Sequence, residues 1–140
     1  MGTANEVLLV YTDGAARGNP GPAAIAYAIF NPEGDCIEKD SKTIGARTNN
    51  QAEYEAMIWA IERVARHDPR RVLFHSDSEV MIRQIDGRYK IKNEGLRERH
   101  ETLMKALNRL PSKSFKNLRR DDPRIQFVDE LVNLVLDECT

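Results

Sequence analysis

Runs of apolar residues, separated by clusters of polar and turn-forming residues, predict the strands of this 140-residue chain. Five such runs lie at residues 7–12, 23–30, 36–44, 71–75 and 113–118. The first reads VLLVYT, a continuous apolar run that is typical of a strand covered on both faces. Because a short stretch of turn formers, residues 31–35, separates the second run from the third, we expect these two strands to form a hairpin.

Apolar residues at helical spacing predict four helices, at residues 51–66, 78–85, 96–110 and 125–138. Asp68-Pro69 ends the first of these helices, Gly87 the second and Pro111 the third. The resulting order is βββαβααβα. Strands that are joined by helices and preceded by a hairpin imply an α/β fold, with a mixed sheet and helices on both faces. No repeat or linker interrupts the pattern, so we expect residues 1–140 to form a single domain.

The composition, 41% hydrophobic and 31% charged residues, is that of an ordinary globular protein. No apolar run approaches the length of a membrane span, and the first residues do not have the pattern of a signal peptide. Cys36 and Cys139 are far apart and have no Cys or His at metal-ligand spacing, which indicates free thiols. We therefore expect a cytoplasmic monomer with no membrane association and no obligate protein partner.

The formal net charge of −1 conceals an uneven distribution of charge along the chain. Between Arg88 and Arg120 there are eleven Lys and Arg against three acids, a local charge of +8. The remainder, with ten basic and nineteen acidic residues, carries −9. A basic segment beside an acidic site suits a protein that binds a phosphate backbone together with metals. Solvated helix surfaces are also commonly rich in Lys and Arg, so both explanations of the basic segment stay open.

Four carboxylates, Asp13, Glu53, Asp77 and Asp129, lie at the edges of predicted elements. Asp13 and Asp77 each follow a predicted strand, at the carboxyl end where open α/β sheets bind ligands. Glu53 shares the apolar stripe of its helix with residues such as Met57, and this stripe must face the sheet. We therefore expect the Glu53 carboxylate to lie over the ends of the two strands.

Each acid, taken alone, also has a structural explanation. An Asp-Gly pair such as residues 13–14 is a common turn sequence. Ser76 with Glu79, and Asn50 with Glu53, both fit capping boxes, which would make acids in those first helical turns ordinary.

The position of Asp129 is not determined by the apolar pattern. The last helix is apolar almost all round, so the pattern does not decide which side of the helix carries Asp129. Asp121 and Asp122 are nearby competitors for the same role.

Taken together, the four acids indicate a metal site. Several like charges in one cleft repel each other unless a cation neutralises them. Mg²⁺ suits an all-oxygen site, in which it keeps waters and completes its shell with substrate phosphate. The chemistry that accompanies a pair of such ions is phosphodiester cleavage.

Three blocks of the sequence contain the first three acids; they read TDGAARGNPGPAAIAYAI, TNNQAEYEAMIWAIE and SDSEVMIRQIDG. These blocks resemble those of type 1 ribonuclease H in order and spacing, and the likeness extends to VDELVN near the end. This resemblance implies the ribonuclease H-like fold with a five-stranded mixed sheet. It also implies cleavage of the RNA strand of RNA/DNA hybrids with Mg²⁺ or Mn²⁺, which leaves 5′-phosphate and 3′-hydroxyl ends. By matching motif positions, Asp13, Glu53, Asp77 and Asp129 are the catalytic, metal-binding carboxylates.

The resemblance implies a set of hybrid-binding residues as well. The members of this set are Gly14, Asn19, Asn49, Asn50, Gln51 and Ser78. A glycine allows the backbone to approach a strand closely, and Asn amides can reach the 2′-hydroxyls that distinguish RNA from DNA. The Asn pair has an alternative explanation as a helix cap.

The chain departs from the family pattern in two places. Many members carry a His on a mobile loop shortly before the last acid, whereas the corresponding NLRRDDPRIQF contains none; we expect Arg119 or Arg120 to substitute for it in part. Some members insert a basic helix after the third block, but here residues 86–93 run directly into the next helix. The chain therefore resembles a short form without the basic protrusion. The residues expected to contact the DNA-strand phosphates are Tyr89, Lys90 and Lys92.

Two other functions remain open at this point. The first is a hybrid-binding module that has lost catalysis, which the missing His favours and the presence of all four acids disfavours. The second is another nuclease of the same fold, such as a transposase or junction resolvase, which would not be expected to need Gly14 and the Asn pair for reading 2′-hydroxyls.

Overall fold

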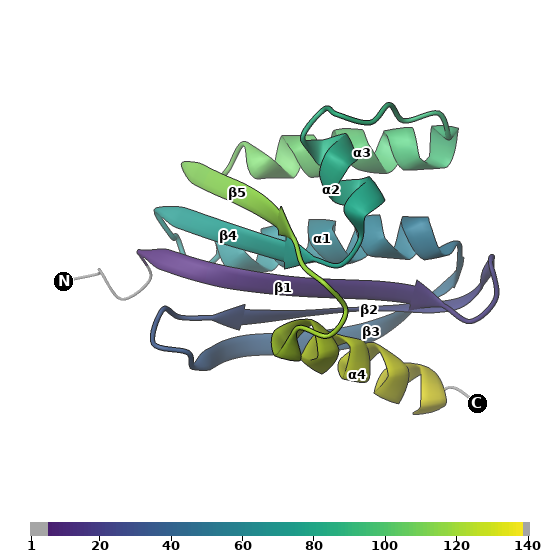
Figure 1. Cartoon of the computed structure of the whole chain (residues 1–140), viewed down its shortest axis with the longest axis horizontal. Helices are drawn as coiled ribbons and strands as arrows, with labels where there is room; N and C mark the ends of the chain where they lie inside the picture. Colours follow the sequence, from purple (N-terminus) through teal and green to yellow (C-terminus); the bar gives the residue numbers. More distant parts are fainter. Residues whose placement is uncertain (1–5, 139–140) are drawn as a thin grey trace.

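The computed structural model describes residues 6–138, and its elements follow the predicted order βββαβααβα (Figure 1). The strands are β1 (Val7–Ala16), β2 (Gly21–Phe30), β3 (Cys36–Arg47), β4 (Arg71–Ser76) and β5 (Ser112–Asn117). The helices are α1 (Asn49–Ala65), α2 (Glu79–Ile85), α3 (Glu94–Leu107) and α4 (Pro123–Glu138). The largest difference from the expected strand boundaries is at β1, which continues past Thr12 to Ala16.

The five strands form one mixed sheet in the order β3-β2-β1-β4-β5. The first three strands along the chain pair antiparallel, whereas β4 pairs parallel to β1 and β5 pairs parallel to β4. The predicted α/β class and mixed five-stranded sheet are therefore confirmed. Because β1 and β4 are parallel neighbours, their carboxyl ends lie at the same edge of the sheet.

Helices cover both faces of the sheet, as predicted. In Figure 1, α1 passes behind the sheet, and α4 lies in front of it across β1, β2 and β3. The face toward α1 and α3 is packed with large side chains, including the fully buried Leu8, Phe74 and Met57. On the opposite face, small residues such as Ala26 of β2 let α4 lie close, so that Val128 is completely buried.

The caps of α1 and α2 are not the predicted ones. Thr48 caps α1: its Oγ1 accepts a hydrogen bond from Gln51 N at 3.1 Å, and Gln51 Oε1 accepts one from Thr48 N at 3.0 Å. The predicted capping box with Asn50 and Glu53 is wrong, since this reciprocal pair begins two residues earlier. Glu53 therefore plays no part in the cap of α1.

At α2, Ser78 is the N-cap and accepts from Met81 N. The predicted box between Ser76 and Glu79 is wrong, because the Ser76 hydroxyl instead accepts from Ser78 N at 3.0 Å.

Two smaller expectations concern the membrane and the cysteines. Within residues 6–138, no helix has the length and apolar character needed to cross a membrane. Cys36 is a free, exposed thiol, whereas Cys139 lies outside the described residues.

Candidate metal and active site

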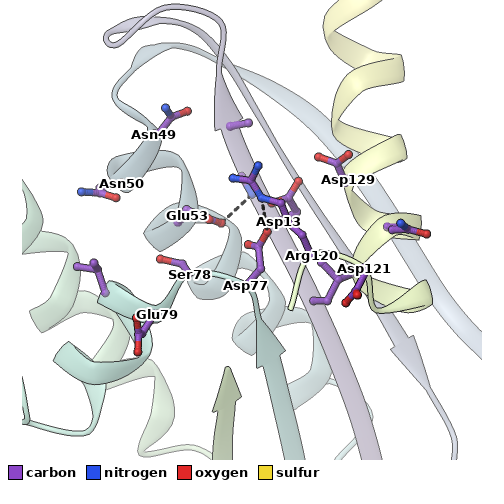
Figure 2. Close-up of a pocket in the computed structure, with 15 residues that line it drawn as sticks. Asp13, Asn49, Asn50, Glu53, Asp77, Ser78, Glu79, Arg120, Asp121 and Asp129 are labelled. Atoms are coloured by element: carbon purple, nitrogen blue, oxygen red, sulfur yellow. Dashed lines mark hydrogen bonds and ion pairs between the residues drawn. The ribbon is translucent and has the colours of Figure 1, made fainter. Parts of the chain in front are cut away.

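The carboxylates of Asp13, Glu53 and Asp77 converge at the edge of the sheet where β4 ends. One oxygen atom of each lies within 4.8 Å of an oxygen of the other two. Figure 2 shows the three side chains pointing toward one another, with Asp129 approaching from α4. We call these four acids the acidic site. The structure thus brings together the four carboxylates that the sequence singled out.

Asp13 reaches this edge in a way that the apolar pattern did not reveal. It does not follow β1, as expected, but lies inside it and pairs with Ala26 of β2. The parallel pairing between β1 and β4, however, ends at Tyr11 and His75. Asp13 is therefore beyond the last paired residue of β4, at the carboxyl end of the parallel part of the sheet.

Gly14 allows α1 to lie against β1. A Cβ atom at this position would be 2.3 Å from the carbonyl oxygen of Ala52, so no other residue fits without moving the helix. Gly14 N donates a hydrogen bond to Glu53 Oε1 at 3.0 Å. Sequence reasoning assigned Gly14 to substrate binding and missed this contact, which holds the Glu53 carboxylate in place.

Asp129 joins the other acids from the opposite side of β1. The four buried residues of α4 lie at helical spacing and determine its orientation; they are Ile125, Val128, Val132 and Leu136. Asn133 Nδ2 donates to Asp129 Oδ2 at 3.3 Å. Of the two competitors, Asp122 accepts from Arg124 N and Ile125 N at the start of α4, whereas Asp121 lines the site.

The acids have little compensating positive charge. Burial, together with the charges of Asp77 and Asp129, raises the pKa of Asp13 from 3.8 to about 8. Burial also raises the pKa of Glu53 well above its usual value, and the charges of Asp13 and Asp77 add to this effect. In the described part of the chain, Asp13 Oδ2 is buried and accepts no hydrogen bond. An unpaired oxygen in an all-oxygen site fits a hard divalent cation, so the acidic site can bind a metal ion.

Arg120 extends over the acidic site from the segment between β5 and α4 (Figure 2). Its Nε lies 3.5 Å from Asp77 Oδ2, although 92% of its side chain is exposed. The neighbouring Arg119 instead points to Asp121, with Nε at 3.9 Å from Oδ1. Of the two arginines that sequence analysis proposed as substitutes for the loop His, the structure places Arg120 at the carboxylates.

The predicted hybrid-binding residues fall into four groups. Gly14, Asn49, Asn50 and Ser78 line the cavity of about 740 Å³ that contains the acidic site. Asn19 lines a second hollow of about 390 Å³, which shares Asn49 and Asn50 with the first cavity. Gln51 belongs to the cap of α1, and Tyr89, Lys90 and Lys92 are exposed on the segment between α2 and α3.

The second hollow includes residues that sequence reasoning missed. Thr48 and Asn93 line it, each as the N-cap of a helix, and the capping chemistry of Asn93 was the available signal. The alternative that the Asn pair is a helix cap is wrong, since Thr48 has that role. Asn49 instead joins the start of α1 to the connection between β1 and β2: its N–H donates to Asn19 Oδ1 at 3.0 Å, and its Oδ1 accepts from Ala16 N at 2.8 Å.

Comparisons with known proteins agree with this geometry. A family model described as Reverse transcriptase-like matches residues 11–135. The chain is 33% identical over 129 residues to Ribonuclease HI of Halobacterium salinarum, a match that covers 92% of this chain and 64% of that protein. Other relatives are matched over only 25% of their own length, so the chain corresponds to a part of several of the proteins it resembles.

Several solved structures share the fold and more than 30% sequence identity with the chain. The crystal structure of RNase H1 from the halophilic archaeon Halobacterium salinarum NRC-1 has a TM-score of 0.90 at 32% identity, and the match covers 94% of this chain and 98% of that one. LC11-RNase H1 from compost, solved in complex with an RNA/DNA hybrid, has a TM-score of 0.89 at 36% identity, again with 94% and 98% covered.

Proposed function

The chain belongs to the Reverse transcriptase-like family and, within it, to the type 1 ribonucleases H, and from this premise we propose that it is a metal-dependent endoribonuclease that hydrolyses the RNA strand of RNA/DNA hybrids. The observation that carries the proposal is the convergence of Asp13, Glu53 and Asp77 within 4.8 Å. Three buried or half-buried acids held so close are costly unless a cation neutralises their charge.

The proposed cofactor is a pair of divalent ions, Mg²⁺ or Mn²⁺, held by the four acids. Asp13 would be a central ligand of these ions, because its Oδ2 is buried and has no hydrogen-bond partner in the described part of the chain. Glu53 and Asp77 would complete the shell of one ion, and Asp129 that of the other. Bound there, the ions supply an activated water and stabilise the charge on the leaving 3′ oxygen.

The residues around the ions have separate tasks in this proposal. The bond from Gly14 N orients the Glu53 carboxylate, and Asn133 restrains that of Asp129. Arg120 can leave Asp77 without unfolding any element, because its side chain is almost fully exposed. We propose that it then pairs with a phosphate of the RNA strand and so assists release of the product that carries the 5′-phosphate.

Recognition of the hybrid is assigned to polar groups beside the acids. Asn49 and Asn50 line both hollows, and with Asn19 they present amides that can read 2′-hydroxyls and minor-groove base edges. Gly14, Gln51 and Ser78 are proposed to contribute to the same surface. The contacts with the DNA strand are assigned to the exposed Tyr89, Lys90 and Lys92. We further propose that the protein acts in the cytoplasm as a monomer.

A substrate panel tests the proposal. The protein is incubated in Mg²⁺ with an RNA/DNA hybrid, double-stranded RNA and double-stranded DNA, and the ends of the products are mapped. We expect cleavage of the RNA strand of the hybrid alone, with 5′-phosphate and 3′-hydroxyl ends. Tight binding of the hybrid without cleavage would instead identify a binding module, and cleavage of DNA would identify another nuclease of this fold.

A further inference from the structure

A carboxylate outside the acidic site, Glu55, joins three elements of the fold. Its Oε2 accepts from Arg47 Nε at 2.7 Å and from Arg99 Nε at 3.0 Å, and Arg99 Nη2 forms an ion pair with it at 3.0 Å. The three side chains are only 22–31% exposed, so solvent screens these ion pairs less than it screens pairs on the open surface. We call this group the Glu55 clamp. It fastens the end of β3 and the start of α3 to α1.

The Glu55 clamp adjoins the lining of the second hollow on two sides. Arg47 directly precedes Thr48, which lines that hollow. Arg99 Nη1 donates to the carbonyl of Gly95 at 2.9 Å, and Gly95 lies between the lining residues Asn93 and Leu96. The clamp therefore acts on both helix starts that form the hollow.

The two sides of the hollow are held by different chemistry. On the side of Asn19, amide hydrogen bonds of Asn49 fix the loop against the start of α1. On the side of α3, and within residues 6–138, the hydrogen bonds that connect this helix to α1 run through Glu55 and Arg99. A methyl group on Gly95 would come within 3.0 Å of Gln51 Nε2, so the two helix starts are also in close contact.

We propose that Glu55 is a positioning residue for substrate binding. It holds the start of α3 at a fixed distance from α1, and at this distance the second hollow receives the part of the hybrid that extends beyond the acidic site. This inference rests on the proposed function, because it names the hybrid as the occupant of the hollow. Glu55 acts through Arg99 and Arg47. Without its charge, the two guanidinium groups repel each other, and α3 loses its attachment next to the hollow.

The test is the Glu55→Gln variant, with Glu62→Gln as the matched control on the exposed part of the same helix. Both variants and the wild type are assayed with a long hybrid and with hybrids shortened from either end, one base pair at a time. For the long hybrid we expect Glu55→Gln to raise KM about tenfold and to leave kcat within about twofold, the pattern of a lost binding contribution. The difference in KM should disappear once the base pairs that fill the second hollow are removed.

A merely structural role for Glu55 would give a different result. It would lower the melting temperature and the active fraction equally for hybrids of every length, and this outcome would overturn the proposal. A wild-type KM on the long hybrid would overturn it as well. If Glu55→Gln does not fold, Arg99→Lys keeps the positive charge without the two-pronged contact and should show a smaller, equally length-dependent rise in KM.

Failure of the proposed function is distinguishable from failure of the clamp. If the wild type binds the hybrid and does not cleave it, the same length series is measured as Kd by fluorescence anisotropy. A Kd of Glu55→Gln equal to that of the wild type for every length would then reject the clamp alone. If the wild type neither binds nor cleaves the hybrid, both proposals are rejected together.

Discussion

Half-buried acids lie near both ends of α1, but their surroundings are opposite. Beside the start of the helix lies the acidic site, whose carboxylates face one another. Beside its end, Glu38 of β3 is surrounded by donors. It accepts hydrogen bonds from the Tyr27 hydroxyl and from Arg63 Nε at 3.0 Å, and His67 Nε2 lies 2.7 Å from its Oε1.

The pKa values express this difference. Burial by itself would raise the pKa of Glu38, but hydrogen bonds from Tyr27, His67 and Arg63 lower it below its usual value. In the acidic site the backbone N–H of Gly14 and the charge of Arg120 do not offset burial and the neighbouring acids, and the pKa of Asp13 rises to about 8. An acid that the chain neutralises itself is part of the scaffold. An acid that the chain leaves uncompensated holds a proton or binds a cation from outside, and such acids cluster at functional sites.

Removing a charge from the acidic site should give the largest effect. We expect Asp13→Asn to reduce Mg²⁺-dependent cleavage of a hybrid by at least about 10³-fold, the scale of losing one preorganised electrostatic group. Above pH 8, where Asp13 is ionised, the metal-free variant should be more stable than the wild type, by about 1–2 kcal/mol, because repulsion is relieved. Cleavage assays and urea unfolding in EDTA measure the two effects. Retained cleavage would show that the acidic site is not the catalytic centre.

The dependence of stability on pH should also differ between the two groups. A pKa of Asp13 raised from 3.8 to about 8 means that the folded state holds a proton more tightly than the unfolded state. The resulting stability is present below pH 3.8 and is lost as pH rises through about 8, at a cost on the order of a few kcal/mol without metal. Glu38, with its lowered pKa, contributes stability that is lost only as pH falls through its folded pKa.

Urea unfolding between about pH 4 and pH 9, in EDTA and in Mg²⁺, checks this expectation. In EDTA the free energy of unfolding should fall toward high pH, and Mg²⁺ should remove most of that fall because it binds the ionised acids of the folded state. The Asp13→Asn variant should have a flatter profile than the wild type. A wild-type profile in EDTA that is flat or rises with pH would contradict the assignment of uncompensated charge to the acidic site.

Removing the charge at the other group should have the opposite consequence. Glu38→Gln is expected to lower the free energy of unfolding by about 1–3 kcal/mol, because Arg63 and His67 lose their charged partner. Its kcat on a hybrid should stay within about twofold of the wild type, since Glu38 contacts Arg63 and His67 at the end of α1, whereas the cavity is lined by residues at the start of this helix. Denaturant unfolding and steady-state kinetics give both values. A large loss of kcat with unchanged stability would erase the distinction between scaffold and site.

Arginine substitutions next to the acidic site should give the smallest effect. Arg120→Ala is expected to reduce kcat about tenfold, because this guanidinium lies 3.5 Å from Asp77 and is the one proposed to meet the phosphate. Arg119→Ala is the matched control and should change kcat by less than about twofold, since Arg119 faces Asp121. Steady-state cleavage of a hybrid measures both. Equal effects of the two substitutions would assign the role to general positive charge and not to Arg120.

Much of the fold and the acidic site could be predicted from local patterns. The order of elements followed from apolar runs and turn formers, and the stripe from Glu53 through Met57 faces the sheet as its spacing required. The caps were predicted at the wrong residues, because the signals of Thr48 and Gln51 lie close to an equally plausible pair. The close contact between Gly14 and Ala52 was missed, since nothing near Gly14 in the sequence indicates which helix will cover it.

The sequence by itself determined the elements and the mixed sheet, because side-chain periodicity and residue chemistry are local properties. It also singled out the four acids as candidates, Asp129 chiefly through the resemblance of the motifs. It did not show which groups surround Glu53, Glu38 and Glu55, three acids that are all half-buried in the fold. The tertiary structure decided that Arg63, 25 residues away, neutralises Glu38 and that Arg99, 44 residues away, neutralises Glu55. Glu53 instead accepts a hydrogen bond from the backbone N–H of Gly14 and lies beside the carboxylates of Asp13 and Asp77. Whether a carboxylate supports the scaffold or can bind a metal depends on charges that only folding brings within reach.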